Sequence, residues 1–249
     1  MPSRLEYKYL VPKNLLPKLR AVVLTYMNYD PYAEIRPHKD YTVHSIYLDT
    51  TDLHCYREKY EGYKIRNKYR LRVYNERRED SLVFLEIKRK NENFISKDRA
   101  KLYFKNLQLL FRSKNVEEYI LTRADGGNDF EEAKKFLFHY FSKQLKPTTL
   151  VVYEREAFVG KFGYDLRITF DKNLRGLVYP EYDNIFNEQN LKAAFPDHFI
   201  LEVKFHQTFP AWVPQMINRY GLQRISVSKY TNCIDINKSQ MHFSSALAF

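Results

Sequence analysis

The sequence predicts an α+β protein in which β-strands dominate. Its 249 residues are 44% hydrophobic and 29% charged, which is typical of a folded globular chain with room for a sizeable core. The chain has 21 Tyr and 18 Phe but only 7 Gly, which favours long aromatic-rich strands with few tight turns. Lys and Arg outnumber Asp and Glu by 41 to 30, and the net charge of +11 predicts an anionic partner.

Residue spacing places the expected strands and helices along the chain. Alternation, or enrichment in β-branched and aromatic residues, predicts eight strands, at residues 3–11, 42–49, 63–75, 82–90, 97–104, 149–160, 164–171 and 198–206. Helical spacing appears at Leu15–Met27, Leu53–Tyr60, Leu107–Thr122, Phe130–Lys143 and Pro210–Tyr220. No shift in composition flanks the loop signal at residues 124–128, so we predict a single domain, residues 1–249.

Cysteine usage and hydropathy indicate a cytoplasmic protein. Cys55 and Cys233 are far apart, which argues against a Cys-rich zinc site and against a disulfide framework. No apolar run approaches the roughly 20 residues that span a bilayer, and the amino terminus lacks the pattern of a signal peptide. We therefore expect the chain to have no transmembrane segment of its own.

The alternation in the strands places charged residues on one face. In a strand, residues two apart share a face, so Lys64, Arg66, Lys68, Arg70 and Arg72 lie together, opposite an apolar face. Charged residues share a face in the same way in five other strands: Arg4, Glu6 and Lys8; Glu86, Lys88 and Lys90; Lys97, Arg99 and Lys101; Asp165, Arg167 and Asp171; and Glu202 with Lys204. The apolar residues of these strands fall on the other face.

Two architectures fit such faces. Neighbouring like charges at 4–8 Å repel by roughly 2–4 kcal/mol a pair at an effective dielectric constant near 20, and a bound polyanion removes that cost. An open basic sheet would bind nucleic acid, whereas a barrel would enclose the charge. The apolar faces can be covered by the amphipathic helices, and the basic face lacks stacking aromatics. We therefore favour a tunnel with a charged interior and expect no nucleic-acid partner.

Eight short motifs occur in order along nearly the whole chain. They are R-x-E-x-K-Y at Arg4–Tyr9, S-I-Y-L-D-T at Ser45–Thr50, K-x-R-x-R at Lys68–Arg72, L-E-I-K at Leu85–Lys88, Y-E-R-E-A-F at Tyr153–Phe158, R-I-T-F-D at Arg167–Asp171, I-L-E-V-K-F at Ile200–Phe205 and S-K-Y at Ser228–Tyr230. Together they resemble the polyphosphate polymerase (VTC) domain of the triphosphate tunnel metalloenzyme (CYTH-like) superfamily. The resemblance implies an eight-stranded antiparallel β-barrel tunnel with α-helices packed outside. It also implies metal-dependent synthesis of inorganic polyphosphate from ATP, with release of ADP and with Mn²⁺ or Mg²⁺ as the metal.

The resemblance carries roles to individual residues. Catalytic contacts to phosphate would come from Lys8, Arg70, Arg72, Lys88, Arg155, Arg167, Lys204 and Lys229. Lys97, Tyr153 and Ser228 would bind substrate, and the shared charged faces add Arg4, Arg66, Lys68, Lys90 and Arg99. Glu202 would hold the metal, with Glu6 as a second carboxylate. Glu202 and Glu86 have an alternative, in which each pairs with a neighbouring lysine on the outer surface.

Position 4 separates the expected polymerase from a hydrolase. The hydrolytic branch of the superfamily opens with E-x-E-x-K, whereas this chain has Arg4 in place of the first Glu. A lining poor in carboxylates favours transfer between phosphates over attack by water. Two alternatives stay open: a tripolyphosphatase or nucleoside triphosphatase, and a non-catalytic sensor of polyphosphate or inositol phosphate. The expected partners are ATP, inorganic polyphosphate and, unless the protein is freestanding, a separate transmembrane protein that receives the product at the inner face of a membrane.

Overall fold

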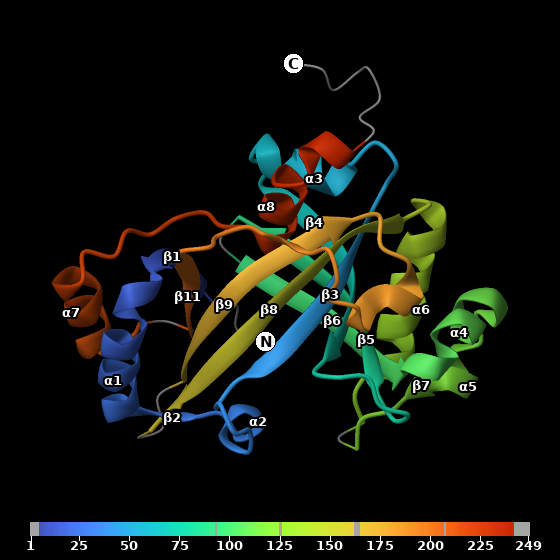
Figure 1. Ribbon diagram of the computed structural model, residues 1–249. Coiled ribbons are helices and arrows are strands. Elements are labelled where there is room, and N and C mark those ends of the chain that lie inside the picture. The colour runs from blue at the N-terminus through green and yellow to red at the C-terminus, as the bar shows by residue number, and fades with distance from the viewer. Residues whose placement is uncertain (1–4, 93, 125, 162–164, 207, 242–249) are drawn as a thin grey trace.

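A computed structural model describes residues 5–92, 94–124, 126–161, 165–206 and 208–241 (Figure 1). Arg4, a predicted substrate ligand, lies outside the described residues. The strands are β1 (Leu5–Pro12), β2 (Met27–Tyr29), β3 (Tyr41–Asp49), β4 (Ile65–Tyr74), β5 (Leu82–Asn91), β6 (Phe94–Tyr103), β7 (Ile120–Leu121), β8 (Lys146–Gly160), β9 (Leu166–Val178), β10 (Lys192–Ala193) and β11 (His198–Phe205). The α-helices are α1 (Leu16–Tyr26), α2 (Pro31–Glu34), α3 (His54–Tyr60), α4 (Leu107–Ser113), α5 (Val116–Tyr119), α6 (Asp129–Ser142), α7 (Trp212–Arg219) and α8 (Lys229–Asp235). Short 3₁₀ helices span Lys13–Leu15, Phe104–Asn106, Tyr182–Phe186 and Lys238–Gln240.

The strands form one antiparallel sheet in a mixed α+β fold. Its order is β1-β11-β9-β8-β3-β4-β5-β6-β7, with β10 on β9 and β2 on β8. Each of the eight predicted strands corresponds to a long strand of this sheet. The three additional strands are two or three residues long, which is too short for a periodic pattern.

The closed eight-stranded barrel is not confirmed. Within the described residues no backbone pairing joins β1 to β6 or β7, so the sheet is not closed. It nevertheless curls, because Lys88 Nζ on β5 lies 3.3 Å from Glu6 Oε2 on β1 although five strands separate β1 and β5 in the sheet order. Charged side chains of β1 and β5 therefore meet across the concave face of the sheet.

Apolar packing covers the face of the sheet opposite the charged one. Helices α1 and α7 bury Leu19, Val23 and Met216 in one cluster with residues of β1, β9 and β11. Helix α6 packs on β5 and β6 and buries Phe136 and Leu137, which lie on one side of the helix. Figure 1 shows α1 and α7 beside β1 and β11, and α4 to α6 beside β5 to β7. Helices therefore shield one face, which leaves the charged face to line an internal space.

Two helix predictions need correction. The segment 107–122 was expected to form one helix, but α4 ends at Ser113, because the next residue, Lys114, has a left-handed φ of 61°, and α5 and β7 follow. The helices α2 and α8, four and seven residues long, were not predicted; α2 is too short to show a helical period. Both begin at a capping residue: Asp30 accepts a hydrogen bond from Ala33 N, and Ser228 accepts one from Thr231 N.

No helix in the described part of the chain has both the length and the apolar character needed to cross a bilayer.

Candidate active site

Two adjoining cavities, of about 680 and 790 Å³, lie along the charged face of the sheet. One lies beside the start of α8 and the other beside α2, and we call them the α8 half and the α2 half of a channel. The residues that line both define its central segment: Leu5, Glu6, Arg70, Arg72, Lys88, Ile95, Arg155 and Lys204. Cavities of this size suit small ligands such as nucleotides.

Strand β4 shows how the sequence builds this channel. Arg66, Lys68, Arg70 and Arg72 line the α8 half, as the alternation predicts. Between them Tyr69, Leu71 and Val73 point to the other face and are buried. Because β4 pairs with β3 on one side and β5 on the other, its backbone is fixed and its cations project from a rigid support.

Glu86 on β5 organises the arginines of the central segment. Its side chain is fully buried and lies 2.6 Å from Arg70 Nε, 3.1 Å from Arg99 Nε and 3.3 Å from Lys97 Nζ. Burial alone would raise the pKa of Glu86, but Arg70 and Arg72 with the two β6 cations lower it well below the usual range. The interpretation that Glu86 pairs with Lys88 on the outer surface is therefore wrong.

Hydroxyl groups complete the positioning of Arg70 and Arg72 on β4. Arg70 Nη1 donates to Tyr47 Oη at 2.9 Å, and Arg72 Nε donates to Ser45 Oγ at 3.0 Å. Arg72 Nη2 also donates to Tyr153 Oη at 3.3 Å. These contacts use only part of each guanidinium fork, so donors remain that can face an anion in the channel.

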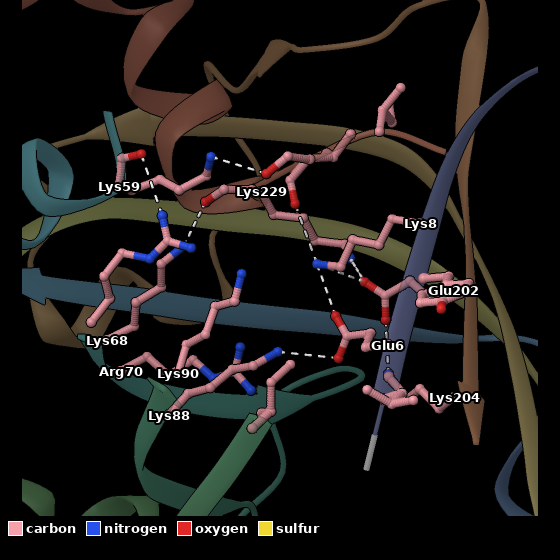
Figure 2. Close-up of a pocket in the computed structure, with 18 of the residues that line it drawn as sticks. Glu6, Lys8, Lys59, Lys68, Arg70, Lys88, Lys90, Glu202, Lys204 and Lys229 are labelled. Carbon is pink, nitrogen blue, oxygen red and sulfur yellow. Dashed lines mark hydrogen bonds and ion pairs between the residues drawn. The ribbon is translucent and has the colours of Figure 1, made fainter. Parts of the chain in front are cut away.

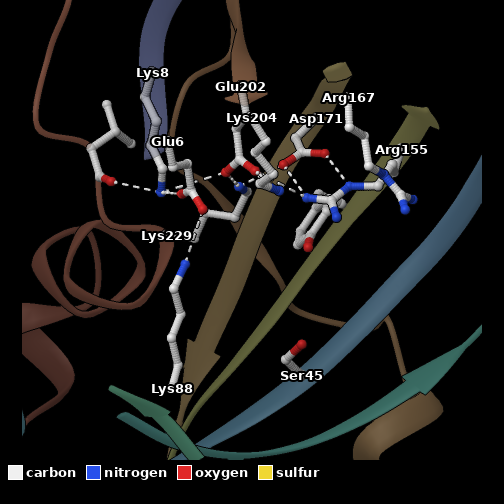
Figure 3. A network of polar contacts seen from close by, with 12 residues as sticks. Glu6, Lys8, Ser45, Lys88, Arg155, Arg167, Asp171, Glu202, Lys204 and Lys229 are labelled. Carbon is white, nitrogen blue, oxygen red and sulfur yellow. Dashed lines mark hydrogen bonds and ion pairs between the residues drawn. The ribbon is translucent and has the colours of Figure 1, made fainter. Parts of the chain in front are cut away.

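A second carboxylate centre lies on β1 and β11 (Figure 3). Lys8 and Glu202 are direct cross-strand partners, and Lys8 Nζ lies 3.0 Å from Glu6 Oε1 and 3.4 Å from Glu202 Oε1. Lys204 Nζ lies 2.8 Å from Glu202 Oε2. Burial alone would raise the pKa of Glu202, but Lys204, Lys229 and Lys8 lower it well below the usual range. Glu202 is thus an ionised, buried carboxylate inside the channel, and not a surface group.

Lys229 and Arg155 join this centre through Asp171. Lys229 Nζ lies 2.5 Å from Asp171 Oδ2 and 2.6 Å from Glu202 Oε1. Arg155 holds Asp171 with two hydrogen bonds, Nε to Oδ1 at 2.6 Å and Nη2 to Oδ2 at 2.7 Å. Lys229 Nζ also lies over the Tyr153 ring, 4.9 Å from its centroid, in a cation–π contact. Asp171 was not among the predicted site residues, although its place on a charged face was a signal.

The α8 half contains cations without acidic partners (Figure 2). Lys68 Nζ donates to Ser228 Oγ at 2.6 Å, and Arg66 Nη1 donates to Lys59 O at 3.5 Å. In the described part of the chain, no ion pair with a carboxylate forms at these cations: Lys59, Arg66, Lys68, Lys90 and Arg224. Burial and the nearby Lys8 and Lys88 lower the pKa of Lys68 well below its ordinary value. This half is the most strongly cationic part of the channel.

The α2 half combines paired cations with aromatic side chains. Lys97 and Arg99 share Glu86, and Arg167 Nη2 lies 2.8 Å from Asp30 Oδ2. Arg167 lines only this half, which also contains the central-segment residues Arg70, Arg72, Lys88, Arg155 and Lys204 but not Lys8 or Lys229. Aromatic and aliphatic residues line the same space: Tyr32, Ile35, Tyr41, Tyr74, Leu82 and Phe84. Tyr32 and Ile35 are 74% and 80% exposed, so they form an open apolar rim.

The sequence analysis missed channel-lining residues that lie outside the strands. Lys59 lies on α3 and Arg224 follows α7, so neither belongs to an alternating strand pattern. Tyr32 and Ile35 lie on and just after α2, a helix too short to predict. Their positions depend on how distant segments pack, which no local pattern encodes.

The carboxylates in the channel limit how a divalent metal can be held. The described residues contain no group of three or more His, Cys, Asp or Glu side chains arranged to hold a metal ion. Glu6 and Glu202 face the cavity together, and Mg²⁺ commonly uses one or two carboxylates together with phosphate oxygens and waters. The pair therefore fits a divalent ion when a phosphate chain supplies the remaining ligands.

Comparisons with known proteins assign the chain to a family. Residues 3–237 match the VTC domain family. The chain is 26% identical over 259 residues to vacuolar transporter chaperone complex subunit 4 of Schizosaccharomyces pombe, covering 88% of this chain and 35% of that protein, about a third of its length. The solved structure of the PH1819 protein from Pyrococcus horikoshii OT3 aligns over 94% of this chain and 98% of its own, with 13% identity and a TM-score of 0.47. From the family match over nearly its whole length, we conclude that the chain belongs to the VTC domain family.

Proposed function

We propose that this protein synthesises inorganic polyphosphate by transferring the γ-phosphate of ATP to a growing polyphosphate chain, with release of ADP. The observation that carries the proposal is the central segment, where Arg70, Arg72, Lys88, Arg155 and Lys204 line both adjoining cavities. Membership of the VTC domain family supports it, because the sequence motifs resemble the polymerase branch. The central segment would hold the reacting phosphates.

Electrostatics and positioning can supply most of this catalysis. In phosphoryl transfer, charge spreads over the equatorial oxygens of the transferred group, and fixed cations stabilise it. Arg70 and Arg72 are already held by Glu86, Tyr47 and Ser45, so they need little reorganisation when phosphate binds. Lysine ammonium groups act as movable point charges, which suits a chain that shifts after each addition.

The proposed reaction needs no general base. The attacking terminal phosphate loses its last proton near pH 6, like other phosphate esters, so it is largely ionised at neutral pH. Four carboxylates in the channel or bound to its lining cations, those of Glu6, Glu86, Asp171 and Glu202, are each engaged with cations. A carboxylate so engaged is poorly placed to orient a water, which favours transfer over hydrolysis.

Glu202 and Glu6 would hold the metal, Mn²⁺ or Mg²⁺, together with phosphate oxygens. Such an ion supplies charge neutralisation on the phosphates when bound. The residues of this chain would bind the phosphates on the other sides: Lys8 and Lys204 from β1 and β11, and Arg155 from β8.

The two halves of the channel suit different parts of the reaction. The apolar rim at Tyr32 and Ile35, with Tyr74 and Phe84 deeper in, suits the base and ribose of ATP. Lys68 and Lys90 in the other half, which form no ion pair with a carboxylate of the described residues, suit a phosphate polymer with no nucleoside. We infer that ATP binds from the α2 half and that the polymer leaves through the α8 half.

A membrane partner forms part of the proposal. The fission yeast relative is named as a subunit of a complex. A separate transmembrane protein that receives the polymer at the α8 half would place this chain at the cytoplasmic face of a membrane.

Product analysis of the purified protein with ATP and Mn²⁺ or Mg²⁺ tests the function. We expect a ladder of phosphate polymers on a gel and ADP in proportion to the phosphate incorporated. Orthophosphate as the sole phosphate product would instead support the hydrolase alternative. Binding of tripolyphosphate without any turnover of ATP would support the sensor alternative.

A further inference from the structure

The space between Glu6 and Glu202 is filled by a lysine of the protein itself. Lys8 Nζ lies 3.0 Å from Glu6 Oε1 and 3.4 Å from Glu202 Oε1, and it donates to Val227 O at 3.3 Å (Figure 3). An ammonium group that bridges two carboxylates occupies the position from which a divalent ion would bridge them. In this arrangement the two carboxylates are neutralised without a metal.

The other carboxylate oxygens of this centre are also engaged. Glu6 Oε2 accepts a hydrogen bond from Lys88 Nζ at 3.3 Å. Glu202 Oε2 accepts one from Lys204 at 2.8 Å, and its Oε1 accepts one from Lys229 at 2.6 Å. Each oxygen of Glu6 and Glu202 therefore faces at least one cation.

The charge of the whole cluster opposes a metal ion on its own. Asp171 adds a third carboxylate, but Arg155 adds a fifth cationic side chain, so cations outnumber carboxylates by five to three. A divalent cation is repelled by this excess. Displacing an ammonium group from a buried carboxylate would also leave a buried charge unpaired, which is strongly unfavourable.

A phosphate chain reverses both effects. Its oxygens offer the lysines an alternative partner, and the flexible stem of Lys8 lets its ammonium group turn from the carboxylates to phosphate. The same oxygens supply metal ligands that Glu6 and Glu202 lack. We propose that Lys8 keeps Glu6 and Glu202 closed to divalent metal until a phosphate chain binds, so that metal and phosphate bind together. This inference rests on the proposed function, because it requires a phosphate chain in the channel.

Reciprocal coupling follows from this arrangement. If tripolyphosphate increases the affinity of the protein for Mn²⁺, then Mn²⁺ must increase the affinity for tripolyphosphate by the same factor. A resident metal site would behave differently, because it would bind Mn²⁺ with similar affinity in the absence of phosphate.

Titration of the full chain with Mn²⁺, followed by electron paramagnetic resonance of free and bound ion, tests the proposal. The arms are protein with Mn²⁺ alone, tripolyphosphate with Mn²⁺ and no protein, and all three together. We expect Mn²⁺ alone to bind at least about 100-fold more weakly than in the ternary mixture, after correction for the protein-free arm. Stoichiometric binding of Mn²⁺ alone at submillimolar concentration would overturn the proposal.

A pair of matched variants isolates Lys8. Lys8→Met removes the bridging ammonium, while Lys88, Lys204 and Lys229 still neutralise the carboxylates, and it should bind Mn²⁺ alone about tenfold more tightly than the wild type. Lys59→Met, a lysine of the same cavity without a carboxylate partner in the described residues, should bind Mn²⁺ as weakly as the wild type does. A folded Lys8→Met variant that binds Mn²⁺ no better than the wild type contradicts the proposal. If that variant does not fold, the wild-type titration decides alone.

The same experiments separate this inference from the proposed function. A protein that makes polymer from ATP yet binds Mn²⁺ tightly without phosphate overturns the role of Lys8 and leaves the polymerase intact. Coupled binding of Mn²⁺ and tripolyphosphate without any polymer supports the role of Lys8 and contradicts the polymerase. A protein that binds neither ligand contradicts both.

Discussion

The α8 half and the α2 half of the channel use cations in different ways. In the α2 half Lys97, Arg99 and Arg167 pair with Glu86 or Asp30, and aromatic rings lie beside them. In the α8 half Lys68 and Lys90 lack an acidic partner among the described residues. Both halves meet in the central segment, so a ligand can touch both.

This difference has an electrostatic consequence. Among the described residues no carboxylate ion pair offsets the repulsion among Lys59, Arg66, Lys68, Lys90 and Arg224, so we expect a polyanion to gain most of its binding free energy at these cations of the α8 half. The paired cations of the α2 half contribute less binding free energy to an anion, but the aromatic side chains beside them offer an apolar surface to a base. The two ends of the channel therefore differ: one end suits a nucleoside and the other suits phosphate alone.

Removal of Arg70 should have the largest effect, since it belongs to both halves. We expect Arg70→Ala to lower polymer synthesis by about 10²–10³-fold, as loss of one preorganised donor does. The fold should persist, because Lys97 and Arg99 still neutralise Glu86. The measurement is the initial rate of polymer formation, with Lys18→Ala on the exposed side of α1 as control. A rate within twofold of the wild type would show that the central segment does not hold the reacting phosphates.

Cations of the α8 half should contribute to the affinity for phosphate and not to the affinity for the nucleoside. The double change Arg66→Met and Lys90→Met should weaken tripolyphosphate binding about tenfold, because two contacts of up to about 1 kcal/mol each are lost. The loss should shrink at high salt, which screens such contacts. Calorimetry at two ionic strengths measures both effects. Equal weakening of adenosine binding would contradict the division between the halves.

Changes to aromatic residues of the α2 half should weaken binding of the nucleoside and not of the phosphate chain. Tyr32→Ala should raise the KM for ATP about fivefold, near the lower end of what base stacking contributes, and leave tripolyphosphate binding unchanged. Tyr63→Ala is the matched control, since Tyr63 is also exposed but does not line the cavity. If both variants behave alike in steady-state kinetics, the base does not lie on this rim.

Protonation of Lys68 should give the smallest effect. Burial with Lys8 and Lys88 nearby lowers its pKa well below the ordinary value of 10.5, and bound phosphate should raise that pKa again. Tripolyphosphate binding should therefore take up protons at alkaline pH below 10.5, and affinity should fall as pH rises through that range. Calorimetry in two buffers of different ionisation enthalpy measures the uptake, which Lys68→Met should lose. An uptake unchanged in that variant would assign the proton to another group.

The sequence predicts the charged face better than the shape of the sheet. Alternation in β4 is local information, and Arg66, Lys68 and Arg70 line the cavity as expected. Closure of the sheet depends on whether β1, at one end of the sheet order, pairs with β6 or β7 at the other end. Local sequence patterns carry no information about that pairing. Lys59 and Tyr32 reach the channel from helices and could not be placed from strand alternation.

Crystallography of the protein with a non-hydrolysable ATP analogue tests the central claim most directly. The account predicts the triphosphate on Arg70 and Arg72 in the central segment, with the base beside Tyr74 or Tyr32 in the α2 half. A triphosphate bound outside the channel, or a base lying against Lys90 in the α8 half, would contradict it.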